Sequence, residues 1–307
     1  MTNRLNFQKK LVLIAGPTAS GKSRLAIHLA KKIKGEIINA DSMQVYKQFS
    51  VLTSRPSSSD LLKVKHHLYG FLSVKKYFST GEWLSLAKDK INQCIKKKRI
   101  PILVGGTGLY FNAITKGMSK IPQIDSNLRY SIRLLHKKIG QKKFYKKLIK
   151  IDPLAKNIVN KHDIQRSIRA FEIKKYTKKS MTQWFKDTKA LFTDDVFIKL
   201  YLDFPRMELL NRIEKRTKQM FKEGAIQEVI KFNRLKIKKE NSANKIIGIN
   251  EINRYLNGEL SLKETKEIIF IKTRQYAKRQ TTWARGQMKS WLKVGPKDLN
   301  LLIKKFK

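Results

Sequence analysis

The chain has 307 residues, of which 41% are apolar, so it can bury the core of one large domain or of two modest ones. Its single cysteine, Cys94, excludes an intrachain disulfide framework and a zinc site made of cysteines alone, which indicates a reducing compartment such as the cytoplasm. Lys and Arg outnumber Asp and Glu by 68 to 23, and the formal charge of +45 predicts a polyanionic partner such as nucleic acid, although a Lys-rich compositional drift would produce the same excess.

Short apolar runs alternate with amphipathic stretches along residues 1–120, a pattern typical of parallel α/β units. We expect buried strands at residues 11–15, 36–40 and 100–106, with helices at about 22–33 and 82–98 between them. No run approaches the roughly 20 apolar residues of a membrane-spanning helix, so we expect no membrane partner. Residues 1–120 are thus predicted to form the first part of an α/β core.

The character of the sequence changes after Gly117, where a Lys-rich segment with helical periodicity begins. Asp125 or Ser126 would cap its first helix, and Gly140 would end that helix. A strand-like run at 196–203 follows, and a long helical pattern then starts at Pro205, which suits the first turn of a helix. We therefore predict a helical insertion domain at 121–195 and the second part of the core at 196–307.

Residues 16–23, GPTASGKS, follow the first predicted strand and open a helix, the context that a phosphate-binding loop requires. Loop amides and the positive end of the helix dipole bind phosphate oxygens. Lys22 would reach the terminal phosphate and Ser23 would ligate Mg²⁺. The predicted site comprises Gly16, Pro17, Thr18, Ala19, Ser20, Gly21, Lys22 and Ser23. The core is accordingly P-loop NTPase-like, but ATP and any other diphosphate compound fit the loop equally well.

Two further predicted strands end in polar residues. Asp41 follows the strand at 36–40, and Thr107 follows the strand at 100–106. Because the carboxyl ends of parallel strands line one crevice, we expect both residues to face the phosphate loop. Asp41 suits a magnesium ligand or a general base, and helix capping is the alternative for both residues.

Four segments in register, GPTASGKS, NADSMQVYK, ILVGGTGLYF and RQYAKRQTTW, resemble the tRNA dimethylallyltransferases, and the similarity runs from about residue 10 to about residue 293. The resemblance implies transfer of a dimethylallyl group from dimethylallyl diphosphate to the exocyclic amine of the adenosine immediately 3′ of the anticodon of tRNA, with release of diphosphate. It also implies Mg²⁺ as the cofactor and a monomer.

On this resemblance, Asp41 would take the proton of the adenine amine, and Thr107 and Arg216 would complete the catalytic set. The residue types suit the chemistry, because the exocyclic amine is a poor nucleophile and the leaving diphosphate gains negative charge. Arg212 and Arg216 lie one turn apart, and the resemblance favours Arg216 as the diphosphate contact. Charges on a solvated helix face are the alternative for both arginines.

The basic insertion would grip the anticodon stem-loop of tRNA while the target base leaves its stack. The resemblance implies tRNA contacts at Asp41, Ser42, Met43, Gln44, Thr107, Arg129, Gln165, Arg166, Ser167, Ile168, Arg169, Lys245, Gly248, Asn250, Arg274 and Lys278. Arg274, Lys278 and Arg285 share one helix face, on a helix that also carries Tyr276 and Trp283. For any single Lys or Arg, a solvated surface charge is the alternative.

Four positions depart from the family pattern. Leu52 stands where a glycine is usual and Gly70 where an acidic residue is usual, while Lys245 and Asn250 replace arginines. Loss of two arginines predicts weaker tRNA binding, because Lys cannot make the bidentate contacts of Arg. The predicted base and phosphate loop are unaffected.

Two other functions fit parts of the sequence. An isopentenyltransferase or kinase that acts on a free nucleotide would use the same loop, but it needs no basic insertion. A non-catalytic RNA-binding ATPase would need nucleotide turnover, and no second hydrolytic motif is present in the sequence.

Overall fold

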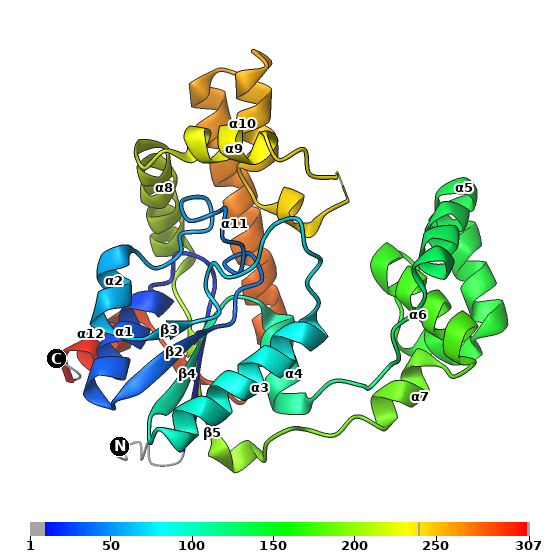
Figure 1. The fold of residues 1–307 in the computed structure, drawn as a ribbon, viewed down its shortest axis with the longest axis horizontal. Coiled ribbons are helices and arrows are strands. Elements are labelled where there is room, and N and C mark those ends of the chain that lie inside the picture. The colour runs from blue at the N-terminus through cyan, green and yellow to red at the C-terminus, as the bar shows by residue number, and fades with distance from the viewer. Residues whose placement is uncertain (1–9, 239, 306–307) are drawn as a thin grey trace. The chain divides into compact units, whose positions relative to one another are not determined.

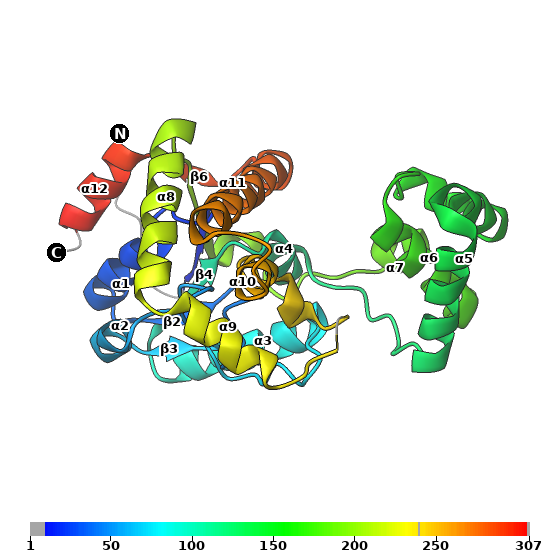
Figure 2. The same cartoon turned by 90° about the horizontal axis from the view of Figure 1, so that it is seen from above.

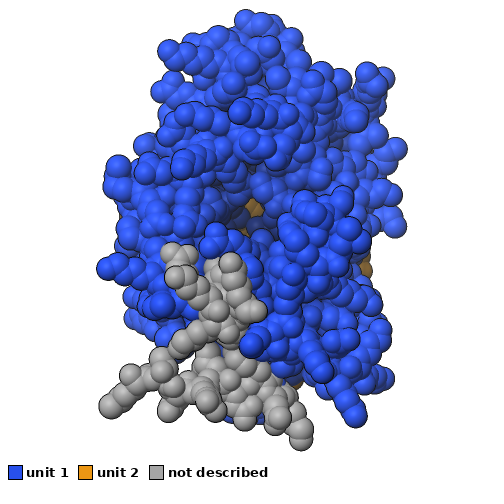
Figure 3. Space-filling model, turned by 90° about the vertical axis from the view of Figure 1, so that its left-hand side faces the viewer, with its two compact units in different colours: residues 1–112, 192–307 blue, residues 113–191 orange. Residues whose placement is uncertain are grey.

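The computed structural model describes residues 10–238 and 240–305 and divides into two compact units. The first consists of Met1–Asn112 and Phe192–Lys307, and the second consists of Ala113–Leu191 (Figure 3). The second unit therefore begins inside helix α4 (Gly108–Lys116), whereas the sequence analysis placed the insertion at 121–195. A helix that crosses the boundary leaves no loop signature in the sequence at that point.

The first unit contains a six-stranded parallel sheet in the order β3-β2-β4-β1-β5-β6. Its strands are β1 (Leu11–Ala15), β2 (Gly35–Asn39), β3 (His66–His67), β4 (Ile100–Gly105), β5 (Phe197–Leu202) and β6 (Leu292–Val294). The predicted parallel α/β core is confirmed, together with all four predicted strands. The two edge strands were not predicted because each has only two or three residues and no apolar run.

Helices flank both faces of this sheet (Figures 1 and 2). Val12, Ile14 and Val104 pack with Leu25 and Leu29 of α1 in one buried cluster. Side chains alternate along a strand, so the buried Leu13 and Leu103 point to the opposite face. The helices before the insertion are α1 (Lys22–Lys32), α2 (Ser58–Lys63), α3 (Thr80–Lys96) and α4.

A second hydrophobic cluster joins the segment after β2 to the helices that follow β5. Phe49 and Leu52 pack there with Phe232, Ile249 and Ile269. The chain re-enters the first unit through η2 (Asp194–Val196), just before β5. The helices after β5 are α8 (Arg206–Lys222), α9 (Ala225–Asn233), η3 (Ser242–Lys245), α10 (Ile249–Leu256), α11 (Leu262–Gln287) and α12 (Pro296–Lys305). Pro205 is the residue before α8 rather than its first residue. Helices α8 and α11 pack against each other beside the sheet (Figures 1 and 2).

The second unit is entirely helical, with a core of its own that includes Phe144, Leu148, Phe171 and Ile173. Its elements are α5 (Ser126–Ile151), η1 (Pro153–Asn157), α6 (Ile164–Thr177) and α7 (Met181–Lys186). Asp125 caps α5, since its side chain accepts hydrogen bonds from the backbone N–H groups of Asn127 and Leu128 at 2.9 and 3.0 Å. The predicted break at Gly140 is confirmed, where φ is +74° between two helical stretches.

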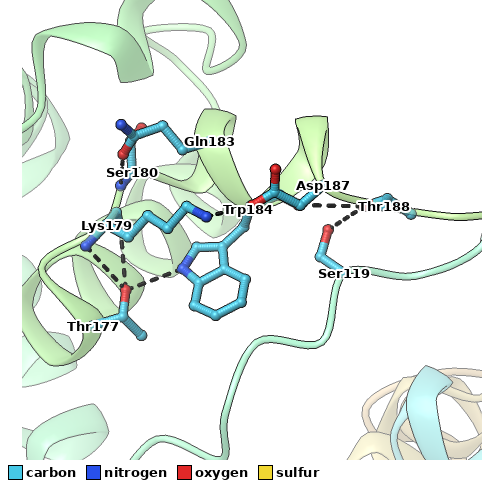
Figure 4. A network of polar contacts seen from close by, with 8 residues as sticks. All are labelled: Ser119, Thr177, Lys179, Ser180, Gln183, Trp184, Asp187 and Thr188. Carbon is cyan, nitrogen blue, oxygen red and sulfur yellow. Dashed lines mark hydrogen bonds and ion pairs between the residues drawn. The ribbon is translucent and has the colours of Figure 1, made fainter.

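A polar network closes the second unit around α7 (Figure 4). The Thr177 hydroxyl accepts a hydrogen bond from the Trp184 indole at 3.1 Å, and Lys179 forms an ion pair with Asp187. The hydroxyls of Ser119 and Thr188 lie 2.6 Å apart, which joins the segments that lead into and out of the helices. Within the described residues, no helix has the length and apolar character needed to span a bilayer.

Candidate active site

A cavity of about 1270 Å³ lies in the first unit, where loops follow β1 and β2. The phosphate loop and Asp41 line it from the sheet, while Arg216 of α8 and Tyr276 of α11 line it from the helices that follow the insertion. Segments more than 170 residues apart in the sequence therefore meet in one space.

The phosphate loop turns into α1 at Gly21, whose φ of +87° is favourable for glycine but strained for other residues. Thr18, Ala19, Gly21, Lys22 and Ser23 line the cavity. Gly16, Pro17 and Ser20 are buried instead, and therefore shape the loop from beneath. The predicted loop thus divides into residues that face the cavity and residues that support them from beneath.

The ammonium group of Lys22 donates a hydrogen bond to the Pro17 carbonyl at 2.7 Å. Burial lowers the pKa of Lys22 to about 8, an effect that the Asp41 carboxylate opposes and the Arg216 guanidinium reinforces. An anion placed beside Lys22 would restore the charged form. Lys22 is therefore most fully charged when the loop holds a negatively charged ligand.

The two arginines of α8 differ in their partners. The Arg216 guanidinium donates a hydrogen bond to the Thr18 hydroxyl, and its pKa is lowered by burial. Arg212 pairs with Glu208 at 2.8 Å, and its guanidinium carbon lies 4.3 Å from the centre of the Phe204 ring. Both line the cavity, but Arg216 is the one bonded to the phosphate loop.

Asp41 lies in a turn after β2 that Asn39 holds in shape. The Asn39 side chain accepts a hydrogen bond from the Asp41 N–H at 2.8 Å and donates to the Asp41 carbonyl at 2.9 Å. One carboxylate oxygen of Asp41 accepts from the Met43 N–H at 2.9 Å, and no helix follows, so Asp41 does not cap one. Asn39 is fully buried, and the sequence analysis missed it because it reads as an ordinary strand end.

Thr107 supports this turn from the loop that follows β4. Its hydroxyl accepts a hydrogen bond from the Ser42 N–H at 2.9 Å and donates to the Ser42 hydroxyl at 3.3 Å. Thr107 does not itself line the cavity. Met43 and Gln44 do, and the Gln44 amide donates to the carbonyls of Thr53 and Ser54 at 2.8 and 3.0 Å.

Tyr276 of α11 was noted in the sequence only for its position on a helix. Its side chain lines the cavity. The pKa of its phenol is raised by burial and by the Asp41 carboxylate, so the phenol stays protonated and can donate a hydrogen bond. No sequence signal distinguished it from other aromatic residues.

At two of the departures, Leu52 and Gly70, the structure is closely packed. Leu52 is buried against Gly248, where a Cβ added to the glycine would lie 2.6 Å from a Leu52 methyl carbon. Arg55 occupies the space above Gly70, where an added Cβ would lie 1.5 Å from a guanidinium nitrogen. Lys245 is exposed and lines the cavity, and Asn250 is exposed on α10.

In the second unit, three arginines surround one buried carboxylate. Arg129, Arg133 and Arg169 lie 3.5, 3.7 and 3.4 Å from the oxygens of Glu172, which is 1% exposed. The arginine side chains are 43–52% exposed, so they remain accessible to an anion. The sequence analysis did not predict Arg133. It could have been found from its position four residues after Arg129, which places both arginines on one helix face.

The other predicted tRNA contacts of α6 differ in accessibility. Gln165 and Arg166 are exposed, and Ile168 is half-buried. Ser167 is buried, and its hydroxyl accepts a hydrogen bond from the Gln141 amide at 3.0 Å. Ser167 therefore joins α5 to α6 in this conformation. On α11, Arg274 and Lys278 are exposed.

Among the described residues, one group of three side chains has the composition of a metal site: Glu36, His67 and Cys94. Glu36 lies near the amino end of β2, at the opposite end of the strand from Asp41. The His67 ring nitrogen lies 2.6 Å from a Glu36 oxygen, which is hydrogen-bonding distance. Burial and Glu36 raise the pKa of Cys94 to about 12, so its thiol stays neutral. We interpret this group as a hydrogen-bonded core cluster.

Comparison with known proteins gives concordant results. Residues 44–287 match the family model described as IPP transferase. A protein of Pelagibacter ubique (strain HTCC1062) named tRNA dimethylallyltransferase is 56% identical over 300 residues, covering 98% of this chain and 96% of the relative.

Solved structures are similar over nearly the whole chain. The full-length tRNA isopentenylpyrophosphate transferase of Bacillus halodurans superposes with a TM-score of 0.69 at 31% identity, covering 96% of this chain and 95% of that one. A eukaryotic dimethylallyltransferase described as acting on tRNA superposes with a TM-score of 0.81 at 27% identity, covering 93% of this chain and 73% of that one.

Proposed function

The chain belongs to the IPP transferase family, and we propose that it transfers a dimethylallyl group from dimethylallyl diphosphate to the exocyclic amine of the adenosine immediately 3′ of the anticodon of tRNA. The observation that carries this proposal is the common cavity of Asp41, Lys22 and Arg216. A group able to accept a proton and groups able to bind a diphosphate thereby face one space. Transfer of an electrophilic carbon from diphosphate to an amine needs both.

On the diphosphate side, Lys22 and the amides of the phosphate loop bind the leaving group. Negative charge grows on the diphosphate oxygens as the bond to the allylic carbon breaks, and preorganised cations stabilise that charge. Arg216 adds a guanidinium contact to the phosphate beside the Lys22 ammonium, since its hydrogen bond to Thr18 holds it beside the loop.

On the acceptor side, Asp41 takes the proton of the adenine amine as the nitrogen–carbon bond forms. The amine lone pair is delocalised into the ring, so a positioned carboxylate contributes about 10²- to 10⁴-fold in rate. Thr107 acts through Ser42 and the turn that carries Asp41, and is therefore a positioning residue.

Mg²⁺ fits the residues of this site. The Ser23 hydroxyl is exposed in the cavity, and Mg²⁺ prefers a few protein oxygens together with substrate phosphates and water. We propose that Ser23 holds the ion, which when bound would neutralise part of the diphosphate charge.

Incubation with labelled dimethylallyl diphosphate, Mg²⁺ and tRNA tests the proposal. We expect label in the tRNA, at the adenosine 3′ of the anticodon, with one diphosphate released per transfer. Label on free adenine nucleotide alone would identify an enzyme of free nucleotides. ATP hydrolysis without transfer to tRNA would identify an RNA-binding ATPase, and either result would contradict the proposal.

A further inference from the structure

Gln280 of α11 bridges the phosphate loop and the loop that follows β4. Its side-chain oxygen accepts a hydrogen bond from the Thr18 N–H at 2.9 Å, and its side-chain nitrogen donates to the Gly106 carbonyl at 2.9 Å. These two partners lie in the loops that follow the neighbouring strands β1 and β4, on either side of one amide.

The bridge needs an amide of this length. An N–H group can only donate and a carbonyl can only accept, so the two partners fix the orientation of the Gln280 side chain. An ionised Glu would place a second acceptor against the Gly106 carbonyl, and Met would leave both backbone groups without a partner.

The loop after β4 approaches α11 too closely for side chains. A Cβ added to Gly106 would lie 2.2 Å from the Gln280 nitrogen, and one added to Gly108 would lie 2.4 Å from the Trp283 ring. The glycines of the GGTG segment therefore let side chains of α11 pack directly against the loop, so that Gln280 reaches the Gly106 carbonyl and the Thr18 N–H.

Each partner of Gln280 leads to one side of the reaction. Thr18 is also bonded through its hydroxyl to Arg216, on the diphosphate side. Gly106 precedes Thr107, whose hydroxyl holds Ser42 beside Asp41 on the acceptor side. Strands β1 and β4 are already paired up to Ala15 and Gly105, and Gln280 extends this connection to the two loops that carry the site.

We propose that Gln280 is a positioning residue that holds the phosphate loop and the Thr107 loop in register, and so sets the distance between the leaving diphosphate and the base Asp41. This inference rests on the proposed prenyl transfer. It assigns to Gln280 an effect on the chemical step rather than on binding, because Gln280 does not itself line the cavity that holds the substrates. A displacement of about 1 Å between reacting groups lowers rates by up to about 10²-fold.

The test compares Gln280→Met and Gln280→Glu with the wild-type chain and with the same changes at Gln275, an exposed glutamine of the same helix. Single-turnover transfer gives the rate of the chemical step. Binding of inorganic pyrophosphate and of tRNA is measured separately, and thermal unfolding reports stability.

For Gln280→Met, we expect a single-turnover rate roughly 10- to 100-fold below wild type, with both binding constants within about threefold of wild type. For Gln280→Glu, the rate relative to wild type should rise as pH falls, because a protonated carboxyl group can again donate to Gly106 while accepting from Thr18. The Gln275 variants should behave as wild type.

Three outcomes would overturn the inference: a wild-type rate in Gln280→Met, a loss explained by weaker binding of one substrate alone, or a pH-independent ratio for Gln280→Glu. The wild-type control separates this failure from failure of the proposed function. If the wild-type chain transfers no prenyl group to tRNA, the proposed function fails first.

Discussion

Asp41 is held by hydrogen bonds that an asparagine can reproduce. One of its carboxylate oxygens accepts from the Met43 N–H, and its backbone is held by Asn39. Asp41→Asn therefore keeps the turn but removes the proton acceptor. We expect single-turnover transfer to fall by about 10²- to 10⁴-fold, while pyrophosphate binding, measured by calorimetry, stays within about threefold. A rate close to wild type would exclude Asp41 as the base.

Lys22 predicts a pH dependence of diphosphate binding. Its pKa of about 8 lies below the ordinary 10.5, so the ammonium is charged below pH 8 and neutral above it. The affinity for inorganic pyrophosphate should therefore fall as pH rises through 8. Bound anion raises the pKa of Lys22, so binding near pH 8 should take up protons, which calorimetry in buffers of different ionisation enthalpy detects.

A Lys22→Gln variant provides the control for this titration, since pyrophosphate itself also titrates. The difference between wild type and variant isolates the contribution of Lys22. Equal pH profiles for the two proteins would contradict the assignment.

At the scale of elements, α5 and α6 together present three arginines around Glu172. Arg133 is the member that the family resemblance did not include. We expect Arg133→Gln to weaken tRNA binding severalfold and to reduce the slope of log K against log salt by about one. Lys138→Gln, an exposed charge on the same helix, controls for net charge. Equal effects of the two changes would mean that Arg133 contributes only through the overall positive charge of the protein.

The contact between Leu52 and Gly248 joins the segment after β2 to the start of α10. Gly248 has a φ of +111°, and an added Cβ would lie 2.6 Å from Leu52. We expect Gly248→Ala to lower the free energy of unfolding by about 2–4 kcal/mol, from overpacking and backbone strain together. Chemical denaturation measures this loss.

Leu52→Ala separates the two causes. In the Leu52→Ala variant, a Cβ at position 248 no longer meets the Leu52 side chain and only the backbone strain remains. There, Gly248→Ala should lower the free energy of unfolding by about 1–3 kcal/mol. Additive effects of the two changes would show that Leu52 and Gly248 are not coupled.

At the scale of the whole molecule, the charge of +45 bears on RNA binding. If the excess serves tRNA binding, log K against log salt should fall with a slope of about −4 or steeper, as roughly six phosphate contacts would give. Filter binding at several salt concentrations measures the slope. A shallow slope would favour compositional drift as the origin of most of the charge.

Local patterns were sufficient to predict much of this molecule. The strands at the centre of the sheet were readable because they are short apolar runs, and the Gly140 break was readable from one residue. The residues that hold the site together were not. Asn39 and Gln280 bind backbone groups that come close only after folding. Arg129 and Arg133 of α5 reach Glu172 of α6 only because these two helices pack together.

The site residues that could be read from the sequence were those that belong to motifs. Lys22, Asp41 and Thr107 each follow a predicted strand, and parallel strands end at one edge. Arg216 lies 198 residues from Thr18, and no local pattern connects the two. Family resemblance supplied Arg216, and the structure shows its contact with the loop.

The order of the strands has a consequence for synthesis of the chain. Strand β1 pairs with β4 on one side and with β5 on the other, and β5 follows the whole helical unit. A ribosome that adds about 5–20 residues per second therefore makes the phosphate loop some tens of seconds before Arg216 and Gln280. Between the synthesis of β4 and that of β5, β1 has one edge without its partner, while the helical unit can already close its own core. The nascent chain thus reaches its substrate-binding form only when the last third has emerged.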